Sequence, residues 1–589
     1  MMKDSRTRSG SIDYHHPGHF WFGIAAVTIG VALHLPMYVE SAGMHYHMAG
    51  MPMDLSMKIG MGLIIVGLIA SFYGLLPRGA ELRQTGGRQV RIRAMDDAPI
   101  TKAHVTLLLI MALAVTIDVM KPVTLGFVVP GMAKEYGLKH PVLNPGGTVP
   151  VSLLPFFGIT GTVIGSFIWG WLSDRIGRRA AILLAAVSFI GTSICGAMPD
   201  YRWNFVMCFI MGLGVGGMLP IVFALLAEII PARHRGWLTV LIGGDVAGAY
   251  ILTSWLASTV GASNAFGWRI LWLLGLPTGL VLVLLNRWIP ESPRFLLQRG
   301  RDDEARDVMR RYGATIVDDE ESELAVVESS VKSSWRQLVG RHFAGLTAVV
   351  AVFGIGVGLV TFGFQLWIPS NLRAMGFDEV SADRILRDSA LLGFPATFLI
   401  AWMYGFWSSK NTLIVLGLAT AASLMGFIVL GNNLAGNRAL LYALLVVPIT
   451  GISSIQAVLV AYSSEVYPTR VRGRATGLGA GATKLGGVLI ITLVVFAIAP
   501  PKIVATSLIG AVPMALGALA VMIWGVETRK RRLEEITAEE LTLGTNQGDR
   551  PIIVTESLRR SDGTYHVAGR APRHSGADGI QSGDDEAAQ

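Results

Sequence analysis

The sequence has few charged residues. Only 15% of its 589 residues are Asp, Glu, Lys or Arg, whereas soluble globular proteins carry about 25%. The shortage is uneven, because charge is absent from long apolar blocks and gathers in short basic segments between them. This distribution is typical of a chain that lies mostly in lipid. The net charge of +8 then indicates basic loops on one side of a membrane, and we expect no nucleic-acid partner.

Cysteine and enzyme motifs are also scarce. The two cysteines, Cys195 and Cys208, lie in apolar blocks without Cys or His at metal-ligand spacing, so we expect small packing residues. The sequence lacks the G-x-x-x-x-G-K-[ST] phosphate loop, the G-x-S-x-G elbow and the H-E-x-x-H zinc motif. These absences disfavour an enzyme and ATP-driven pumping. We expect no cofactor, with copper as the one alternative considered below.

The apolar blocks are long enough to cross a membrane, which takes about 20 residues per helix. A first pair covers 20–39 and 59–77. The first block of this pair is too long for a signal peptide, and no small-x-small cleavage site follows it. A set of twelve spans follows, near 104–131, 150–172, 180–198, 203–229, 238–260, 268–288, 346–372, 386–407, 411–431, 438–464, 477–499 and 504–525.

Basic residues lie in alternate loops. They concentrate in 78–102, in 173–179, near 470 and after 528, while the loops that alternate with these carry one or two each. The positive-inside rule then predicts fourteen spans with both termini in the cytoplasm of a bacterial cell, in its inner membrane. The predicted parts are the N-terminus (1–19), an extra two-helix hairpin (20–77), a basic linker (78–103), a first half (104–288), a central loop (289–345), a second half (346–525) and a largely disordered tail (526–589).

The chain contains an internal repeat. The pattern E-x-x-P-x-R-x-R-G begins at Glu228 and recurs 237 residues later at Glu465. Pro stops a helix at the membrane surface, where an Arg, such as Arg235 or Arg472, can pair with the Glu. Two six-helix halves related by a repeat are a transporter signature, and the substrate site of such proteins lies between the halves.

Three motifs carry a resemblance to a known family. The loop after the second of the twelve spans reads Gly170-Trp-Leu-Ser-Asp174-Arg175-Ile-Gly177-Arg178-Arg179. It is similar to the signature of the major facilitator superfamily. The runs P-E-S-P-R-F-L-L at 290–297 and E-T-R…L-E-E-I at 527–536 resemble sugar porters and metabolite:proton symporters. The resemblance covers roughly 100–540.

This resemblance implies an all-α membrane fold of two six-helix halves, with the hairpin as an addition. It also implies a cytoplasmic charge latch that favours the outward-open state. The residues expected in this gate are Gly170, Asp174, Arg175, Gly177, Arg178, Arg179, Glu228, Arg235, Glu465 and Arg472.

The sequence departs from the family pattern in three places. The second-half counterpart of the Asp-Arg loop, near 405–411, lacks the acid and the Arg pair. Cys208 occupies the position of an Arg that the family links to proton transfer. The Gln-rich helix pattern with which sugar porters hold hexoses is missing, so a hexose is not favoured.

Ionisable side chains within the spans are functional candidates, because each costs at least about 2.5 kcal/mol at mid-membrane. Asp118 and Lys121 are three residues apart, on one helix face and close enough to pair. We predict that Asp118 takes a coupling proton and that Lys121 contacts an anionic substrate or tunes Asp118; the alternative is a buried structural pair. Further candidates for the cavity are Asp245, Gln365, Trp367, Gln456, Tyr462 and Lys484, with snorkelling as the alternative for Lys484.

The external loop of the extra hairpin is rich in Met and His. Residues 37–57 hold six Met and two His, and thioether with imidazole suits copper. Met44, His45, His47 and Met48 form the candidate ligand set. Apolar interfacial filling by Met is the alternative.

The function that these features favour is secondary transport. We expect proton-coupled symport of a small organic, anionic metabolite by a monomer that alternates access between its two halves. Its partners would be the substrate, protons and the lipid bilayer. Two alternatives remain, namely proton-driven efflux and copper handling by the Met/His loop.

Overall fold

The computed structural model describes residues 7–9, 12–76, 95, 98–140, 144, 146–299, 301–314, 338–340, 343–467, 469–495 and 502–528. All of them belong to one compact unit, Met1–Asp318 with Ser333–Lys530. A second unit, Asp319–Lys332 with Arg531–Gln589, lies outside the described residues, and so does most of the predicted tail.

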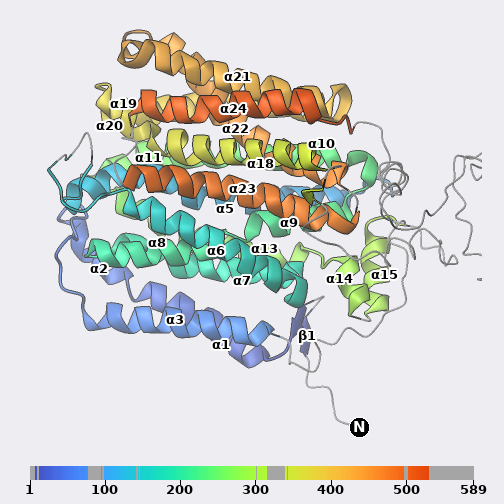
Figure 1. Ribbon diagram of the computed structural model, residues 1–589. Helices are drawn as coiled ribbons and strands as arrows, with labels where there is room; N and C mark the ends of the chain where they lie inside the picture. The colour runs from blue at the N-terminus through green and yellow to red at the C-terminus, as the bar shows by residue number, and fades with distance from the viewer. Residues whose placement is uncertain are drawn as a thin grey trace, which may run out of the picture. The chain divides into compact units, whose positions relative to one another are not determined.

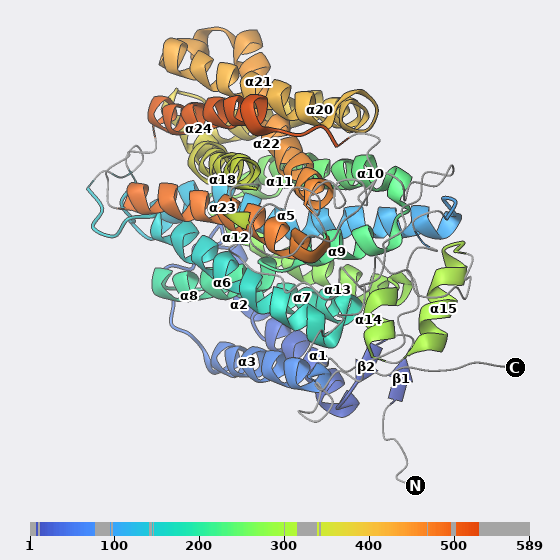
Figure 2. The same cartoon turned by 45° about the vertical axis from the view of Figure 1, so that its right-hand side comes forward.

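Long helices that run beside one another make up most of the described chain (Figures 1 and 2). Thirteen helical stretches of the described residues are long and apolar enough to cross a membrane. The fourteenth predicted span is α6 (Leu153–Ile176), which is apolar over Leu153–Ser166 and ends in the basic motif loop. The all-α prediction is confirmed, and fourteen spans agree with the helices observed. A two-stranded ribbon, β1 (Thr7–Ser9) with β2 (Ile12–Tyr14), precedes them.

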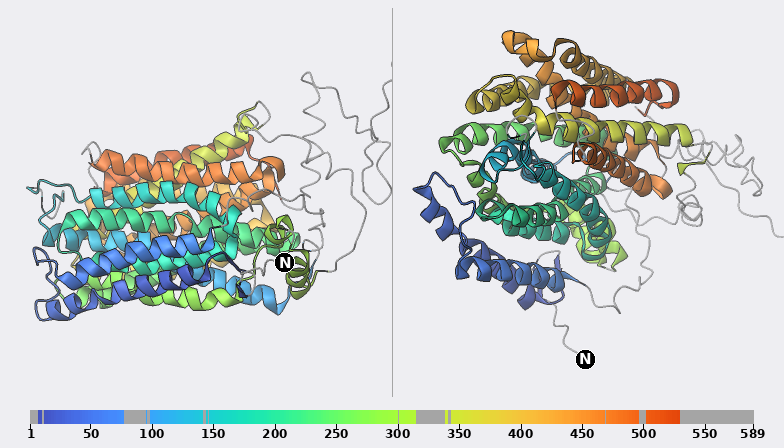
Figure 3. Two further views of the ribbon diagram at one scale, coloured as in Figure 1. Left: turned by 90° about the horizontal axis from the view of Figure 1, so that it is seen from below. Right: turned by 60° about the vertical axis from the view of Figure 1, so that its left-hand side comes forward.

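The extra hairpin is built on glycines. It comprises α1 (Pro17–Ala32), α2 (Leu35–Ala42) and α3 (Leu55–Leu75), and it lies at one edge of the bundle (Figure 3). A methyl group on Gly30 would come within 2.7 Å of the carbonyl oxygen of Gly60, and one on Gly67 within 2.7 Å of that of Gly23. Small residues therefore let the two helix backbones touch, which is how membrane helices associate without a hydrophobic driving force.

The first half contains six membrane-crossing segments, three of them made of two helices. Gly216 and Gly217 separate α8 from α9, and Asp245 separates α10 from α11. The segments are α5 (Lys102–Glu135), α6, α7 (Arg178–Gly191) continued by Thr192–Ala197, α8 (Tyr201–Val215) with α9 (Met218–Ile229), α10 (Ala232–Gly244) with α11 (Val246–Thr259) and the turn Gly261–Ser263, and α12 (Trp268–Leu273) with α13 (Gly275–Leu285) and the turn Asn286–Trp288.

The second half follows two short helices of the central loop, α14 (Pro293–Gln298) and α15 (Asp302–Arg311). Its segments are α18 (Ala344–Leu359), continued through Val360–Phe364 and Gln365–Trp367 into α19 (Ile368–Ala374), then α20 (Glu379–Trp402) with Met403–Trp407, α21 (Ser409–Leu430) with Gly431–Gly436, α22 (Arg438–Val466), α23 (Thr469–Val495) and α24 (Ile503–Trp524).

The break that Pro448 makes in the hydrogen bonding of α22 is compensated by the neighbouring helix α21. Pro448 in α22 has no N–H, so the carbonyl of Leu444 loses its helical partner. The hydroxyl of Ser423 on α21 donates to that carbonyl at 2.6 Å. In lipid such a carbonyl finds no water, and a side chain from the next helix is the usual remedy.

The two ends of the bundle carry different polar clusters. One end, here termed the loop face, holds the hairpin loop 43–54 and a fully buried ion pair between Glu135 and Arg269, with 2.7 Å between its N and O atoms. The backbone N–H groups of Met48 and Ala49 donate to Glu135 at 2.9 and 3.1 Å. The hairpin loop is thereby fixed on the first half. The opposite end, the latch face, holds Arg178, Glu228 and Glu291.

Candidate functional site

Two opposite charges on facing sides of the seam between the halves interact electrostatically. Asp118 on α5 is 1% exposed and interacts electrostatically with Lys484 of α23. The Lys484 ammonium also donates to the carbonyl oxygens of Gly216, at 3.1 Å, and Thr162, at 3.5 Å. Oδ1 of Asp118 has no hydrogen-bond partner among the described residues. The sequence left open whether Lys484 lines the cavity or snorkels to the membrane surface. In the structure its side chain crosses the seam and binds the first half.

The predicted contact between Asp118 and Lys121 is wrong. Three residues along a helix turn the side-chain direction by roughly 300°, which leaves the two directions about 60° apart. Lys121 lies against Gly275 of α13, where an added methyl group would overlap its Nζ, and it interacts with the buried Cys195. Its Nζ has no hydrogen-bond partner among the described residues. Lys121 therefore points into the first half, and Asp118 points toward the second.

The remaining candidates divide by position. Asp245 accepts a short hydrogen bond from Thr116 of α5, so it lies close to the helix that carries Asp118. Gln365 is buried and donates to the carbonyl of Pro448 at 2.9 Å, which is a contact within the second half. Gln456 is half-buried on α22.

Trp367 and Tyr462 lie toward the ends of the bundle. The ring of Trp367 is 6.4 Å from that of His140, in the segment that links α5 to α6. The hydroxyl of Tyr462 donates to the carbonyl of Val526 at 2.8 Å and accepts from the N–H of the same residue at 2.7 Å. Tyr462 therefore holds the end of α24, and its predicted place in a central cavity is wrong.

On the latch face, Glu291 of the P-E-S-P-R run caps the start of α7. Its carboxylate accepts from the N–H of Arg178 at 2.7 Å and of Arg179 at 3.2 Å. Gly177 precedes them with φ of 95°, and a methyl group there would overlap Glu291. The motif glycine is therefore required twice, for its backbone conformation and for the space it leaves. Burial raises the pKa of Glu291 to about 7, against the opposing effect of these N–H donors and of Arg178.

The same cluster contains the first copy of the repeated motif. Arg178 pairs with Glu228 at 3.4 Å, and both side chains are largely buried. The hydroxyl of Ser292 donates a short hydrogen bond to the same Glu228. Arg179 donates to the backbone and side-chain oxygens of Asn286 at 3.0 and 3.2 Å. Arg175 accepts on its carbonyl from Arg299 at 2.5 Å. Three separate sequence motifs thus form one cluster.

The second half repeats this arrangement with other side chains. Glu527 accepts from the N–H of Ser409, the first residue of α21, at 3.0 Å. Thr528, the next residue, donates to Glu465 at 2.8 Å, as Ser292 does to Glu228. The partner that replaces Arg178 is the hydroxyl of Tyr404, which donates to Glu465 at 2.7 Å.

The halves also approach each other at the latch face. Arg235 of α10 interacts electrostatically with Glu465 of α22. A methyl group on Gly236 would lie 2.5 Å from Oε1 of Glu465. Both copies of the repeated motif therefore take part in this contact. The side chains of Gly170, Asp174 and Arg472, which were expected in the gate, lie outside the described part of the chain, so their roles stay predictions.

The predicted copper ligands differ in exposure. Met48 is fully buried, whereas Met44, His45 and His47 are exposed. The ring of His47 packs edge-on against that of Phe266 at 4.9 Å. Across the described residues, no three His, Cys, Asp or Glu side chains gather as a metal site. Copper binding at this loop stays a prediction.

Sequence reasoning missed Glu527 and the pair Glu135–Arg269. Glu291 and Glu527 follow the sixth and twelfth spans, and they are 236 residues apart, almost the offset of the repeated motif. That near-identity was the available signal for their shared role. Glu135 and Arg269 gave no signal, because single charges at span ends are ordinary.

Comparison with known proteins agrees with this geometry. The family model for sugar (and other) transporters matches residues 127–539. The niacin transporter NiaP of Acinetobacter baylyi is 26% identical over 406 residues, covering 67% of this chain and 88% of that protein. The 4-hydroxybenzoate transporter PcaK of the same organism is 25% identical over 410 residues, covering 67% and 85%.

Solved structures show the same fold. The proton:xylose symporter XylE bound to 6-bromo-6-deoxy-D-glucose aligns with a TM-score of 0.60 at 20% identity, over 74% of this chain and 98% of that chain. The partially occluded inward open form of XylE from Escherichia coli gives 0.57 at 19%, over 73% and 99%. The chain therefore belongs to the sugar (and other) transporter family of the major facilitator superfamily, and it is a multi-pass membrane transporter of sugars or metabolites, not an enzyme.

Proposed function

We propose that this transporter is a proton-coupled symporter of a small organic anion. The observation that carries the proposal is the pair of opposite charges, Asp118 and Lys484, on the two sides of the seam. Names of relatives add support, because niacin and 4-hydroxybenzoate are carboxylic acids. We place the latch face in the cytoplasm, with both termini, and the protein in the bacterial inner membrane as a monomer.

Coupling follows from the cost of uncompensated charge in a buried site. In the empty carrier, ionised Asp118 balances Lys484. In the loaded carrier, a proton on Asp118 and a substrate carboxylate on Lys484 balance again. A carrier with only the proton holds an unpaired cation, and one with only the anion holds an excess negative charge. Both half-loaded forms are costly, so proton and anion cross together.

Lys484 is suited to this exchange of partners. Its two contacts, to the carbonyl oxygens of Gly216 and Thr162, have neutral acceptors and are weaker than a bond between an ammonium and a carboxylate. Loss of the Asp118 charge leaves these contacts alone. The ammonium then becomes available to a carboxylate that arrives in the seam.

The test is uptake into proteoliposomes under an imposed inward proton gradient, with nicotinate, 4-hydroxybenzoate and xylose as probes. We expect accumulation of a carboxylate that a protonophore abolishes and that Lys484→Gln lacks. Protein-free liposomes correct for weak acids that cross the bilayer unaided, and Lys58→Gln, an exposed lysine of the hairpin, is the matched control. Accumulation of xylose alone, or uptake that ignores the protonophore, would overturn the proposal. Loss of preloaded substrate under the same gradient would favour efflux.

A further inference from the structure

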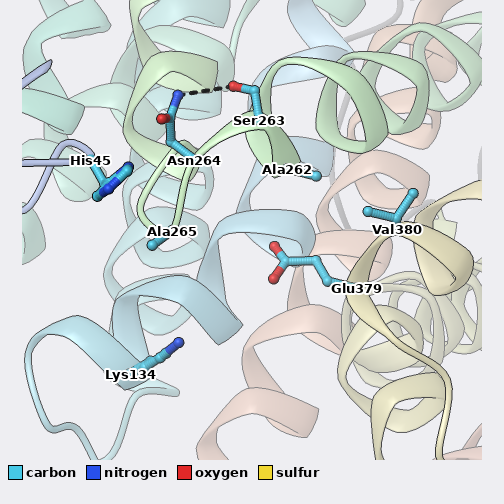
Figure 4. A pocket seen from close by; sticks show the side chains of 8 residues that line it. All are labelled: His45, Lys134, Ala262, Ser263, Asn264, Ala265, Glu379 and Val380. Carbon is cyan, nitrogen blue, oxygen red and sulfur yellow. Dashed lines mark hydrogen bonds between the residues drawn. The ribbon is translucent and has the colours of Figure 1, made fainter.

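A pocket on the loop face brings together all three parts of the bundle. Its volume is about 420 Å³, and Figure 4 shows its lining. The hairpin loop contributes His45, and the first half contributes Lys134, at the end of α5, and the segment 262–265. The second half contributes Glu379 and Val380, in the first turn of α20. We refer to it as the seam pocket.

The charges of the seam pocket favour an anion. Glu379 pairs with Arg373 at 3.2 Å, which balances part of its negative charge, and Arg373 also interacts with Asp383. Lys134 is exposed and, within the part of the chain that the structure describes, has no ion-pair partner. The hydroxyl of Ser263 donates to the carbonyl of Val260 at 2.7 Å, and the amide of Asn264 donates to Ser263 at 3.2 Å, which leaves its second N–H for a ligand. An ammonium with one neutral amide donor beside it is a suitable environment for a single carboxylate.

The hairpin holds its part of the lining in place. His45 and Tyr46 have φ of 54° and 64°, a left-handed conformation that is uncommon outside glycine. The carbonyl of His45 accepts from the N–H of Phe266 at 3.2 Å, and Glu135 binds the loop three residues further on. His45 is therefore fixed at the edge of the pocket by contacts with the first half.

We propose that the seam pocket binds a small organic carboxylate between Lys134 and the hairpin loop, as a second site distinct from the Asp118–Lys484 pair. Because both halves line it, its ligand binds the conformation in which their loop-face ends are together, and occupancy stabilises that conformation. The extra hairpin then has a defined role, since it completes the site with His45. This binding does not depend on transport, and it can be measured where transport is disabled.

The experiment is calorimetric titration of the purified full chain, carrying Lys484→Gln, with benzoate, nicotinate and succinate, and with neutral benzamide as control. We expect saturable binding of at least one carboxylate and none of benzamide. Adding Lys134→Ala should weaken it about tenfold, because a charge-assisted bond is lost. Lys134→Arg should stay within about threefold, and Lys58→Ala should match the parent. No binding of any carboxylate, or equal effects of Lys134→Ala and Lys58→Ala, would overturn the proposal.

A second measurement avoids changing the lining charges. Ala265 lines the seam pocket, and both native cysteines are buried, so Ala265→Cys can be labelled selectively with a maleimide. The bound carboxylate should slow this labelling at least threefold while leaving Ala42→Cys, an exposed position of α2, unchanged. Equal rates with and without ligand would contradict the site. If the symport proposal were wrong and this one right, the proteoliposomes would show no uptake, but the carboxylate would still slow the labelling of Ala265→Cys.

Discussion

The latch clusters of the two halves share a backbone role and differ in charge. In both halves a glutamate after the last helix caps the third helix, and the residue after that glutamate donates a hydroxyl to the glutamate of the repeated motif. In the first half an arginine of the same half, Arg178, pairs with this glutamate, whereas in the second half Tyr404 takes that place and the arginine near Glu465 is Arg235 of the first half. Helix capping is thus the same in both copies, whereas the cation lies within the half in one copy and across the seam in the other.

The largest expected effect is the difference in stability lost when each of the two capping glutamates is replaced by Ala. Glu291 is 1% exposed and accepts from three backbone N–H groups, so Glu291→Ala leaves buried donors unpaired and should destabilise the protein by about 3 kcal/mol. Glu527 accepts from one backbone N–H group and from the hydroxyls of Ser408 and Ser409. It is half-buried, so water can replace it, and Glu527→Ala should cost about 1 kcal/mol. Thermal unfolding in detergent measures both, with the exposed Glu40→Ala as control. Equal losses of stability in the two variants would show that the two glutamates contribute equally, against this expectation.

The second effect is a pH dependence of stability that comes from the capping glutamate of the first half. Burial raises the pKa of Glu291 from 4.5 to about 7, so the folded state binds its proton more tightly than the unfolded state. The resulting stability is present in full below pH 4.5 and is lost as the pH rises through about 7. The difference in Tm between the wild type and Glu291→Gln should therefore shrink over this interval. A difference that grows with pH would show that Glu291 is held as the carboxylate.

The third effect concerns the partners of the motif glutamates. Arg178→Gln leaves the largely buried Glu228 without its cation and should cost about 2 kcal/mol. Tyr404→Phe removes one hydroxyl from Glu465, which keeps Thr528, and should cost about 1 kcal/mol. Denaturant unfolding of the two variants measures the gap. A larger loss in Tyr404→Phe would place the stronger lock in the second half.

The smallest effect tests whether the hydroxyl links are equivalent. Ser292→Thr and Thr528→Ser each keep an O–H donor beside the motif glutamate, so each should change stability by less than about 0.5 kcal/mol. Ser292→Ala and Thr528→Val, which remove the donor, should each cost about 1 kcal/mol. The free energy of unfolding of all four variants is the measurement. If packing and not the hydrogen bond mattered, Ser292→Thr would destabilise the protein as much as Ser292→Ala.

The sequence predicted what depends on local composition. Helix spans, including those of the hairpin, follow from apolar length, whereas the break at Asp245 inside the span predicted at 238–260 was not foreseen. Contacts between helix faces were not predictable, because a change of direction of roughly 60° decides which neighbour a side chain meets. For this reason Lys121 was paired with Asp118, although it lies against Gly275, and Lys484 was left undecided. The contact of Tyr462, on α22, with the chain just after α24 was not predicted for the same reason.

The central claim is that Asp118 couples a proton to the movement of an anion, and Asp118→Asn tests it most directly. The variant resembles the protonated state, so its loaded form is balanced while its empty form leaves Lys484 unpaired. It should exchange labelled for unlabelled substrate in proteoliposomes at a rate close to that of the wild type. It should fail to accumulate substrate under an inward proton gradient. Gradient-driven accumulation by Asp118→Asn, sensitive to a protonophore, would contradict the account.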